Sequence, residues 1–167
     1  MEAIRIVEFL LYVLGKGGYF WLAIYALYAL YGKTVLVWVF VAGFVLNDVL
    51  NRVLKMAIRE ERPQPWTSDK SHYLYYGMPS GHAQHMFFIA TFLYLQGDVP
   101  YMPYVWILCV IVVFERIYSK QHTWKQIVVG ACIGTVFAYG LHKNLPVLTQ
   151  TIQSLRKKCL LPIVRCV

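Results

Sequence analysis

The chain has 167 residues, 59% of them hydrophobic, with 13 Tyr and 5 Trp that mostly flank the apolar runs. This hydrophobic share lies above the roughly 45–50% of soluble domains, which argues against a soluble protein and predicts an integral membrane protein in a lipid bilayer. The 16 Lys and Arg outnumber the 8 Asp and Glu, giving a net charge of +8. Because these basic residues lie between apolar segments and form no long stripe, we expect an anionic lipid or acidic substrate as partner and no nucleic acid.

Apolar runs separated by Gly and Pro predict helices over residues 2–15, 17–32, 34–56, 80–97, 101–119 and 124–142. The first run is short and is also compatible with a helix lying in the membrane interface. After Lys143 the sequence is typical of a basic amphipathic helix on the membrane surface. The predicted fold class is therefore all-α, a polytopic membrane helix bundle of about six helices plus a C-terminal amphipathic helix. Residues 1–145 would form the transmembrane domain and residues 146–167 the basic tail.

Three polar regions interrupt this pattern: residues 55–79, the start of the fourth predicted helix, and residues 115–126. If consecutive helices alternate across the membrane, all three regions lie on the same side. Some basic residues on that side are assigned below to a site and are left out of the comparison. Of the remaining Lys and Arg, fewer lie on that side than on the other. By the positive-inside rule, this favours a site outside the cytosol.

A polar stripe runs along the third predicted helix, where Asn47, Asn51 and Lys55 recur every four residues. Polar and ionisable residues within a membrane usually face the bundle interior or a water-filled cavity, so we expect this stripe to point inward. Asp48 and Arg52 share the i, i+4 spacing of a structural ion pair. Lys55 is also followed, seven residues later, by Arg62 and a Pro, although a Lys at a helix end commonly snorkels to the interface.

Pro79-Ser80-Gly81-His82 begins the next apolar run. This stretch has the composition of an ordinary turn and N-cap, but it could equally direct the amides of a helix N-terminus at an anion. Gly81 would let backbone approach the ligand closely, and Ser80 could cap the helix or donate to a phosphate oxygen.

The third polar region contains Arg116, His122 and Gln126, and the last two share a helix face at i, i+4. Cations, two histidines and a helix N-terminus on one side of a bundle are the groups that a phosphoryl-transfer site needs.

Together, KMAIREERP, PSGH and ERIYSKQHTWKQ resemble the signature motifs of the type 2 phosphatidic acid phosphatase superfamily, KxxxxxxRP, PSGH and SRxxxxxHxxxD. Their order and spacing match over residues 55–126. GMPSGHAQHMFF and HTWKQ look most like the dolichyldiphosphatase branch. The chain departs from the general pattern at Glu115, where the superfamily usually has Ser, and at Gln126, where it usually has Asp.

The resemblance implies a lipid phosphatase in which His122 attacks phosphorus to form a phosphohistidine and His82 transfers protons. Gln126 would then hold the useful tautomer of His122. The implied phosphate-binding residues are Lys55, Arg62, Ser80, Gly81 and Arg116. No metal or other cofactor is implied. The implied substrate is a polyprenyl diphosphate such as dolichyl diphosphate and, if the source is eukaryotic, the implied location is the endoplasmic reticulum with a luminal site.

Other interpretations stay open at this point. The enzyme could act on phosphatidate or a sphingoid-base phosphate, or the chain could be a non-catalytic relative that only binds lipid phosphates. His82 and His85 have the i, i+3 spacing of a zinc pair, but no third ligand is convincingly placed. Glu60, Glu61 and Asp69 are interpreted as a solvated loop face, with Glu115 available to pair with a neighbouring cation.

Overall fold

The computed structural model describes residues 23–152 and 154, apart from residues 29, 32, 66 and 98. Its main helices are α2 (Thr34–Ile58), α3 (Gly81–Leu95), α4 (Met102–Tyr118) and α5 (Trp124–Lys143), with a short 3₁₀ helix η1 (Tyr73–Tyr75). Residues 23–28 and 145–152 are also helical. The only extended pairing in the described part of the chain is an isolated bridge between Glu61 and Tyr76. The predicted all-helical fold class is confirmed.

The last four predicted helices begin and end within two residues of α2, α3, α4 and α5. The helix predicted over residues 2–15 lies outside the described residues, as do the first part of the 17–32 helix and the end of the 146–167 tail. The boundaries were predictable because local chemistry sets them. Ser80 and Thr123 each cap the following helix by accepting a hydrogen bond from a first-turn amide.

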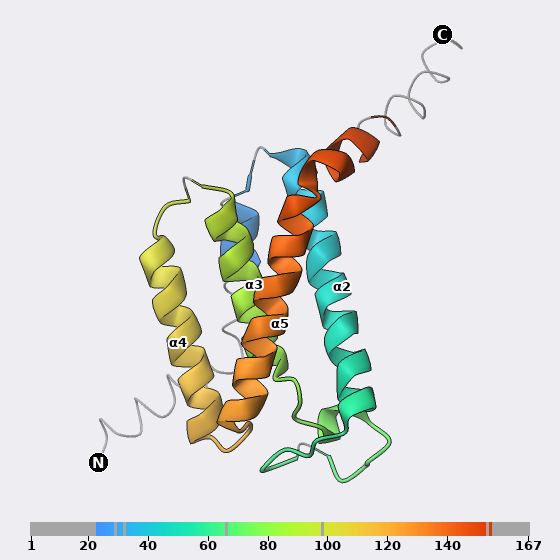
Figure 1. Ribbon diagram of the computed structural model, residues 1–167. Helices are drawn as coiled ribbons and strands as arrows, with labels where there is room; N and C mark the ends of the chain where they lie inside the picture. The colour runs from blue at the N-terminus through green and yellow to red at the C-terminus, as the bar shows by residue number, and fades with distance from the viewer. Residues whose placement is uncertain are drawn as a thin grey trace.

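Helix α3 lies at the centre of the bundle, between α4 on one side and α2 and α5 on the other (Figure 1). Its apolar residues are spread around the whole helix and do not gather on one face, which is the pattern of a helix surrounded by others. The rings of Phe88 and Phe92 stack with 6.1 Å between their centroids, and Phe40 of α2 packs against both, at 6.0 and 5.6 Å. This aromatic cluster joins α2 to α3.

Two glycines of α5 allow the backbone of α3 to approach closely. A Cβ atom at Gly130 would lie 2.5 Å from the carbonyl oxygen of Ser80, and one at Gly134 would clash with the carbonyl oxygen of Gln84. Small residues four apart are a common device for packing membrane helices against each other. Here they place the start of α3 directly against the first turns of α5.

The predicted inward-facing stripe of α2 is confirmed, because Asn47, Asn51 and Lys55 are all buried. Gln84 of α3 joins the two asparagines. Its Nε2 donates to the carbonyl oxygen and Oδ1 of Asn47 at 3.0 and 2.9 Å, and its Oε1 accepts from Asn51 Nδ2 at 2.8 Å. The predicted ion pair between Asp48 and Arg52 is also present, at 2.6 Å. These side chains thus satisfy most of one another's hydrogen-bonding groups, and Asn47 Nδ2 is the buried atom of the network with no hydrogen-bond partner among the described residues.

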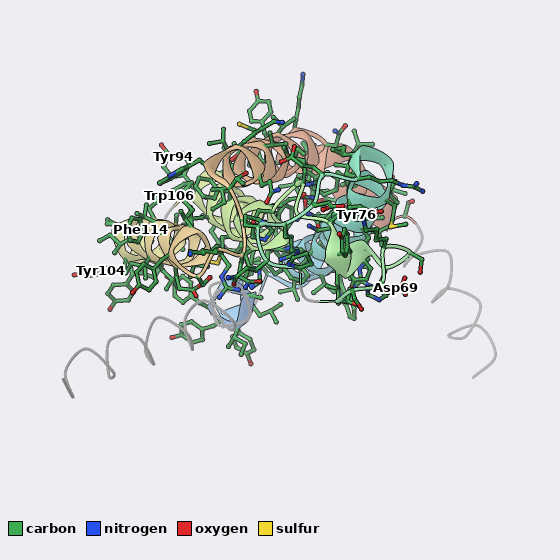
Figure 2. The ribbon with its side chains drawn as sticks, turned by 90° about the horizontal axis from the view of Figure 1, so that it is seen from below. Asp69, Tyr76, Tyr94, Tyr104, Trp106 and Phe114 are labelled. Carbon is green, nitrogen blue, oxygen red and sulfur yellow. The ribbon has the colours of Figure 1, made fainter. Side chains whose placement is uncertain are left out.

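Helices α2 and α5 are long and apolar enough to cross a bilayer. Large apolar side chains also cover the outside of the bundle. Tyr104 and Phe114, for example, lie at the outer edge of α4, where 68% and 57% of their surface is exposed (Figure 2). Exposed apolar surface on this scale is unfavourable in water and indicates a membrane location.

Candidate active site

The three sequence motifs meet at one end of the bundle, the lower end in Figure 1. Helix α2 ends there and α3 begins there, after the loop that carries η1, and the turn between α4 and α5 lies beside them. This is the arrangement expected if consecutive helices run in opposite directions. Seen from below, Asp69 and Tyr76 of the loop lie on the α2 side of the bundle, away from α4 (Figure 2).

Lys55 and Arg62 are held together by one backbone oxygen. Lys55 Nζ donates to the carbonyl oxygen of Tyr76 at 3.0 Å, and Arg62 Nε donates to the same oxygen at 3.1 Å. Both side chains are buried, with 2% and 7% of their surface exposed. Burial, and secondarily the nearby Arg116 guanidinium, lowers the pKa of Arg62 to about 10. The two cations therefore converge on a position where an anion oxygen could replace a neutral carbonyl.

His122 is buried between Arg62 and Gln126. Its Nδ1 lies 3.1 Å from Gln126 Oε1, and its Nε2 lies 3.2 Å from Arg62 Nη1. Since an amide oxygen can only accept and a guanidinium can only donate, these neighbours assign the proton to Nδ1 and leave a lone pair on Nε2. Burial, followed by the charges of Arg62 and Lys55, lowers the pKa of His122 well below its ordinary value. The imidazole is uncharged at neutral pH, and the lone pair of its Nε2 faces the Arg62 guanidinium.

Gln126 is completely buried and forms hydrogen bonds with both ends of its amide. Oε1 accepts from His122 Nδ1 and, at 3.2 Å, from the backbone N–H of Thr123, which completes a capping box at the start of α5. Nε2 donates to Glu60 Oε1 at 3.0 Å and to the carbonyl oxygen of Glu61 at 2.9 Å. Gln126 thus links His122 to the loop that follows α2.

The interpretation of Glu60 as part of a solvated loop face holds only in part, because 30% of its side chain is exposed. Glu60 accepts from Gln126 through one carboxylate oxygen and pairs with Lys125 Nζ at 2.9 Å through the other. Glu61 follows the prediction more closely, because its side chain is exposed and pairs with Lys70. Sequence reasoning could not choose between two adjacent glutamates in a loop, where no helical or strand periodicity shows which one faces inward.

Ser80 differs in part from its predicted role. It is fully buried, its hydroxyl accepts from the amide of Ala83, and its own amide donates to the carbonyl oxygen of Gln126 at 3.0 Å. The amide of Ser80 therefore joins α3 to α5 and is not directed at a ligand. Of the PSGH residues, Gly81 and His82 are the ones that face the cavity described next.

A cavity of about 400 Å³ lies between α2, the loop and α3. It is bordered by residues from these three elements: Phe44, Asp48, Asn51, Arg52, Lys55, Arg62, Tyr73, Leu74, Gly81, His82 and His85. The predicted residues Lys55, Arg62, Gly81 and His82 are thus brought together at one surface. His122 and Gln126 do not border this cavity, and His122 reaches it through its contact with Arg62.

Arg116 is also placed differently from its predicted role. Its guanidinium pairs with the buried carboxylate of Glu115, as expected for Glu115, and Arg116 does not border the cavity. Its carbonyl oxygen accepts from the amide of His122 at 3.1 Å, which fixes the backbone of that residue. Arg116 therefore contacts His122 through its backbone, and its charge acts on both Arg62 and His82.

His85 has partners that account for its position without a metal ion. Its Nδ1 lies 2.6 Å from the carbonyl oxygen of Gly81, and its Nε2 lies 3.5 Å from Asp48 Oδ1. Within the part of the chain that the structure describes, no group of three or more His, Cys, Asp and Glu side chains is arranged to hold a metal ion.

The site combines paired cations, an oriented neutral imidazole and a helix N-terminus at one end of an apolar bundle. These are the groups that a membrane protein needs to handle a phosphate ester. The PAP2 superfamily model matches residues 36–149, and the chain belongs to this superfamily.

Curated relatives carry the names of lipid phosphatases. The chain is 31% identical over 109 residues to Dolichyldiphosphatase 1 of Dictyostelium discoideum and 32% identical over 118 residues to Dolichyldiphosphatase 1 of Homo sapiens. It is 30% identical over 112 residues to Lipid phosphate phosphatase gamma of Arabidopsis thaliana. These matches cover 58–59% of this chain and 47–48% of each relative, so the chain spans about half the length of the curated relatives it matches. No solved structure gives a significant match.

Proposed function

We propose that the protein is an integral membrane phosphatase that hydrolyses the terminal phosphate of a polyprenyl diphosphate, such as dolichyl diphosphate, through a phosphohistidine on His122. The observation that carries the proposal is the orientation of His122. Its Nδ1 faces Gln126 Oε1 and its Nε2 faces the Arg62 guanidinium. The nucleophilic lone pair is therefore directed towards a cation that can hold the phosphate it would attack.

The phosphate would bind where Lys55 and Arg62 converge. Both side chains now donate to the carbonyl oxygen of Tyr76, and a phosphate oxygen is a stronger acceptor for a cation than a neutral carbonyl. The first-turn backbone at Gly81 borders the same cavity and adds the positive end of the α3 dipole. These groups would stabilise the equatorial oxygens of the transferring phosphoryl group without a divalent metal.

The reaction would take place in two steps. First, His122 Nε2 attacks the terminal phosphorus and forms a P–N bond, while the bond from phosphorus to the bridging oxygen breaks and His82 gives that oxygen a proton. Second, water attacks the phosphohistidine and the P–N bond breaks. His82 takes the proton of this water, and inorganic phosphate leaves. His82 borders the cavity from the start of α3, a position from which it could serve both steps.

A lipid substrate is supported by the position of the site. The cavity is bordered by α2, a helix long and apolar enough to cross a bilayer, so a substrate could keep its apolar tail in the membrane while its phosphate enters the site. The names of the dolichyldiphosphatase relatives support a polyprenyl diphosphate. In a eukaryotic cell we expect the protein in the endoplasmic reticulum, with the site facing the lumen.

Phosphate release by the purified protein in detergent, with EDTA present, tests the proposal. Dolichyl diphosphate and phosphatidate are compared as substrates for wild type, His122→Ala and His142→Ala. His142 lies at the opposite end of α5, where it contacts Gln96, and it serves as the matched control. We expect hydrolysis of the diphosphate that survives EDTA, falls by at least about a thousandfold in His122→Ala and is unchanged in His142→Ala.

A second candidate function is a phosphatase for phosphatidate or a sphingoid-base phosphate, which the lipid phosphate phosphatase relative favours. Faster hydrolysis of phosphatidate than of the diphosphate would select it. Absence of turnover on either lipid by folded wild-type protein that still binds lipid phosphate would instead select a non-catalytic binding role. Trapping of phosphate on His122 during turnover would support the proposed intermediate.

A further inference from the structure

The side-chain amide of Gln126 fits its surroundings in only one orientation. Its oxygen faces two donors, His122 Nδ1 and the amide of Thr123, and its nitrogen faces two acceptors, Glu60 Oε1 and the carbonyl oxygen of Glu61. A flipped amide would place an oxygen against two acceptors and an NH₂ group against two donors. All of its hydrogen-bonding capacity would then be lost in a buried position.

Glu60 is the charged member of this set. Its Oε1 is 3.0 Å from Gln126 Nε2 and its Oε2 is 2.9 Å from Lys125 Nζ, while 30% of its side chain is exposed. The hydrogen bond from Lys125 is the main cause that lowers the pKa of Glu60, so the carboxylate stays ionised at neutral pH. A carboxylate charge, paired on its other oxygen with the exposed Lys125 ammonium, therefore lies one amide group away from His122.

We propose that Glu60 is a positioning residue for His122, acting through Gln126. Its carboxylate fixes the Gln126 amide with Oε1 towards His122 Nδ1, and its charge makes that oxygen a better acceptor. The inference rests on the proposed function, in which His122 is the nucleophile.

The charge of Glu60 has a physical effect because hydrogen bonds in a chain polarise one another. A carboxylate that accepts from the N–H of an amide increases the negative charge on the oxygen of the same amide. His122 becomes positively charged as it is phosphorylated, and the groups that face it from the other elements are Lys55, Arg62 and His82. Glu60 supplies the negative charge that a neutral glutamine cannot supply by itself.

Two substitutions at this position separate charge from shape. Glu60→Gln keeps an oxygen that can accept from Gln126 and removes the charge, whereas Glu60→Ala removes both. We expect kcat to fall roughly 10-fold in Glu60→Gln and roughly 100-fold in Glu60→Ala, with KM within about twofold of wild type, because Glu60 does not border the cavity proposed to bind the phosphate. Asp69→Asn is the matched control, since Asp69 is an exposed carboxylate of the same loop that bonds to Ser71. Its kcat should stay within about twofold.

A charge swap gives a readout that a purely structural role would not produce. Gln126→Glu places a carboxylate against that of Glu60, and the repulsion should lower kcat. Adding Glu60→Gln to this variant removes the repulsion. The double variant should have a kcat about tenfold higher than Gln126→Glu alone. The same substitution is thus harmful in the wild-type background and beneficial in the Gln126→Glu background. Equal effects of Glu60→Gln in both backgrounds would overturn the proposal.

A measurement without turnover separates this inference from the proposed function. Nitrogen-15 NMR of histidine-labelled protein in detergent reports the tautomer of His122, whose signals are assigned by their loss in His122→Ala. We expect the Nδ1–H tautomer in both proteins, because Arg62 still donates to Nε2, and a weaker Nδ1–H hydrogen bond in Glu60→Ala, seen as a change in the Nδ1 chemical shift. If wild type hydrolyses lipid phosphates but the Glu60 variants match Asp69→Asn in kcat and in the Nδ1 chemical shift, the positioning role is refuted while the function stands. If wild type is inactive but the Nδ1 chemical shift changes as expected, the positioning is supported and the function fails.

Discussion

The close contact between α5 and α3 at Gly130 predicts how tightly the site depends on helix packing. A methyl group added by Gly130→Ala would lie 2.5 Å from the Ser80 carbonyl oxygen, whereas ordinary van der Waals contact begins at 3.4 Å, a shortfall of about 0.9 Å. The obstructing atom belongs to the backbone and cannot rotate away, so the helices themselves must separate. The hydrogen bond from the Ser80 amide to the carbonyl oxygen of Gln126, now 3.0 Å, would be lost.

The cost follows from these changes. Overpacking of this kind costs about 1–3 kcal/mol and the lost hydrogen bond about 1 kcal/mol, while replacing Gly by Ala within a helix gains about 1 kcal/mol. We therefore expect Gly130→Ala to be destabilised by about 2 kcal/mol. Because the start of α3 would move by about 1 Å relative to His122, activity should also fall roughly 100-fold.

Gly140→Ala is the matched control, because a Cβ atom at Gly140 on the same helix has no neighbour within 4 Å. It should gain the helix propensity without the clash, so the two variants should differ by about 3 kcal/mol, or roughly 6–12 °C in Tm. Thermal unfolding followed by tryptophan fluorescence in detergent, with phosphate release measured on the same samples, tests this. Equal Tm and activity in Gly130→Ala and Gly140→Ala would refute the reasoning.

Three further predictions concern the site and its support. Because His122 must be neutral to attack and its pKa is lowered, the acid-side inflection of kcat/KM should lie well below the ordinary value of 6.5, and an inflection at or above 6.5 would contradict this. Arg62→Lys keeps the charge but cannot contact both Tyr76 and His122, so kcat/KM should fall roughly 10- to 100-fold in steady-state assays, and unchanged kinetics would count against the assigned geometry. Gln84→Leu leaves Asn47 and Asn51 without their shared partner, so thermal unfolding should show a loss of about 2–4 kcal/mol, and an unaltered Tm would show that the network is not stabilising.

The fold and several site residues could be predicted because their signals are local. Helix ends follow from capping residues such as Thr123, and the burial of the α2 stripe follows from the cost of exposing Asn51 or Lys55 to lipid. The contact between His122 and Gln126 was predicted from their i, i+4 spacing, but His122 lies just before the N-cap of α5, so the contact is made across the capped helix start. Each of these predictions needed only residues close together in the sequence.

What the sequence could not show depends on contacts between distant segments or on the backbone. The carbonyl oxygen of Tyr76 accepts from Lys55 and Arg62, but any residue type has such an oxygen and nothing in the sequence marks this one. The amide of Ser80 is occupied by Gln126, a contact that exists only because α5 packs against α3. Glu60 is recognisable as part of the site only once the loop is placed beside α5.

The shared contact of Lys55 and Arg62 with Tyr76 has a thermodynamic consequence. Both are long side chains with many rotamers, and ordering such a side chain when a ligand binds costs about 0.5–1.5 kcal/mol. Here the ordering takes place during folding, because one carbonyl oxygen already holds the two cations together. An anion that enters the cavity therefore meets a preorganised pair, and its affinity reflects the exchange of one acceptor for a stronger one, with little further loss of conformational entropy.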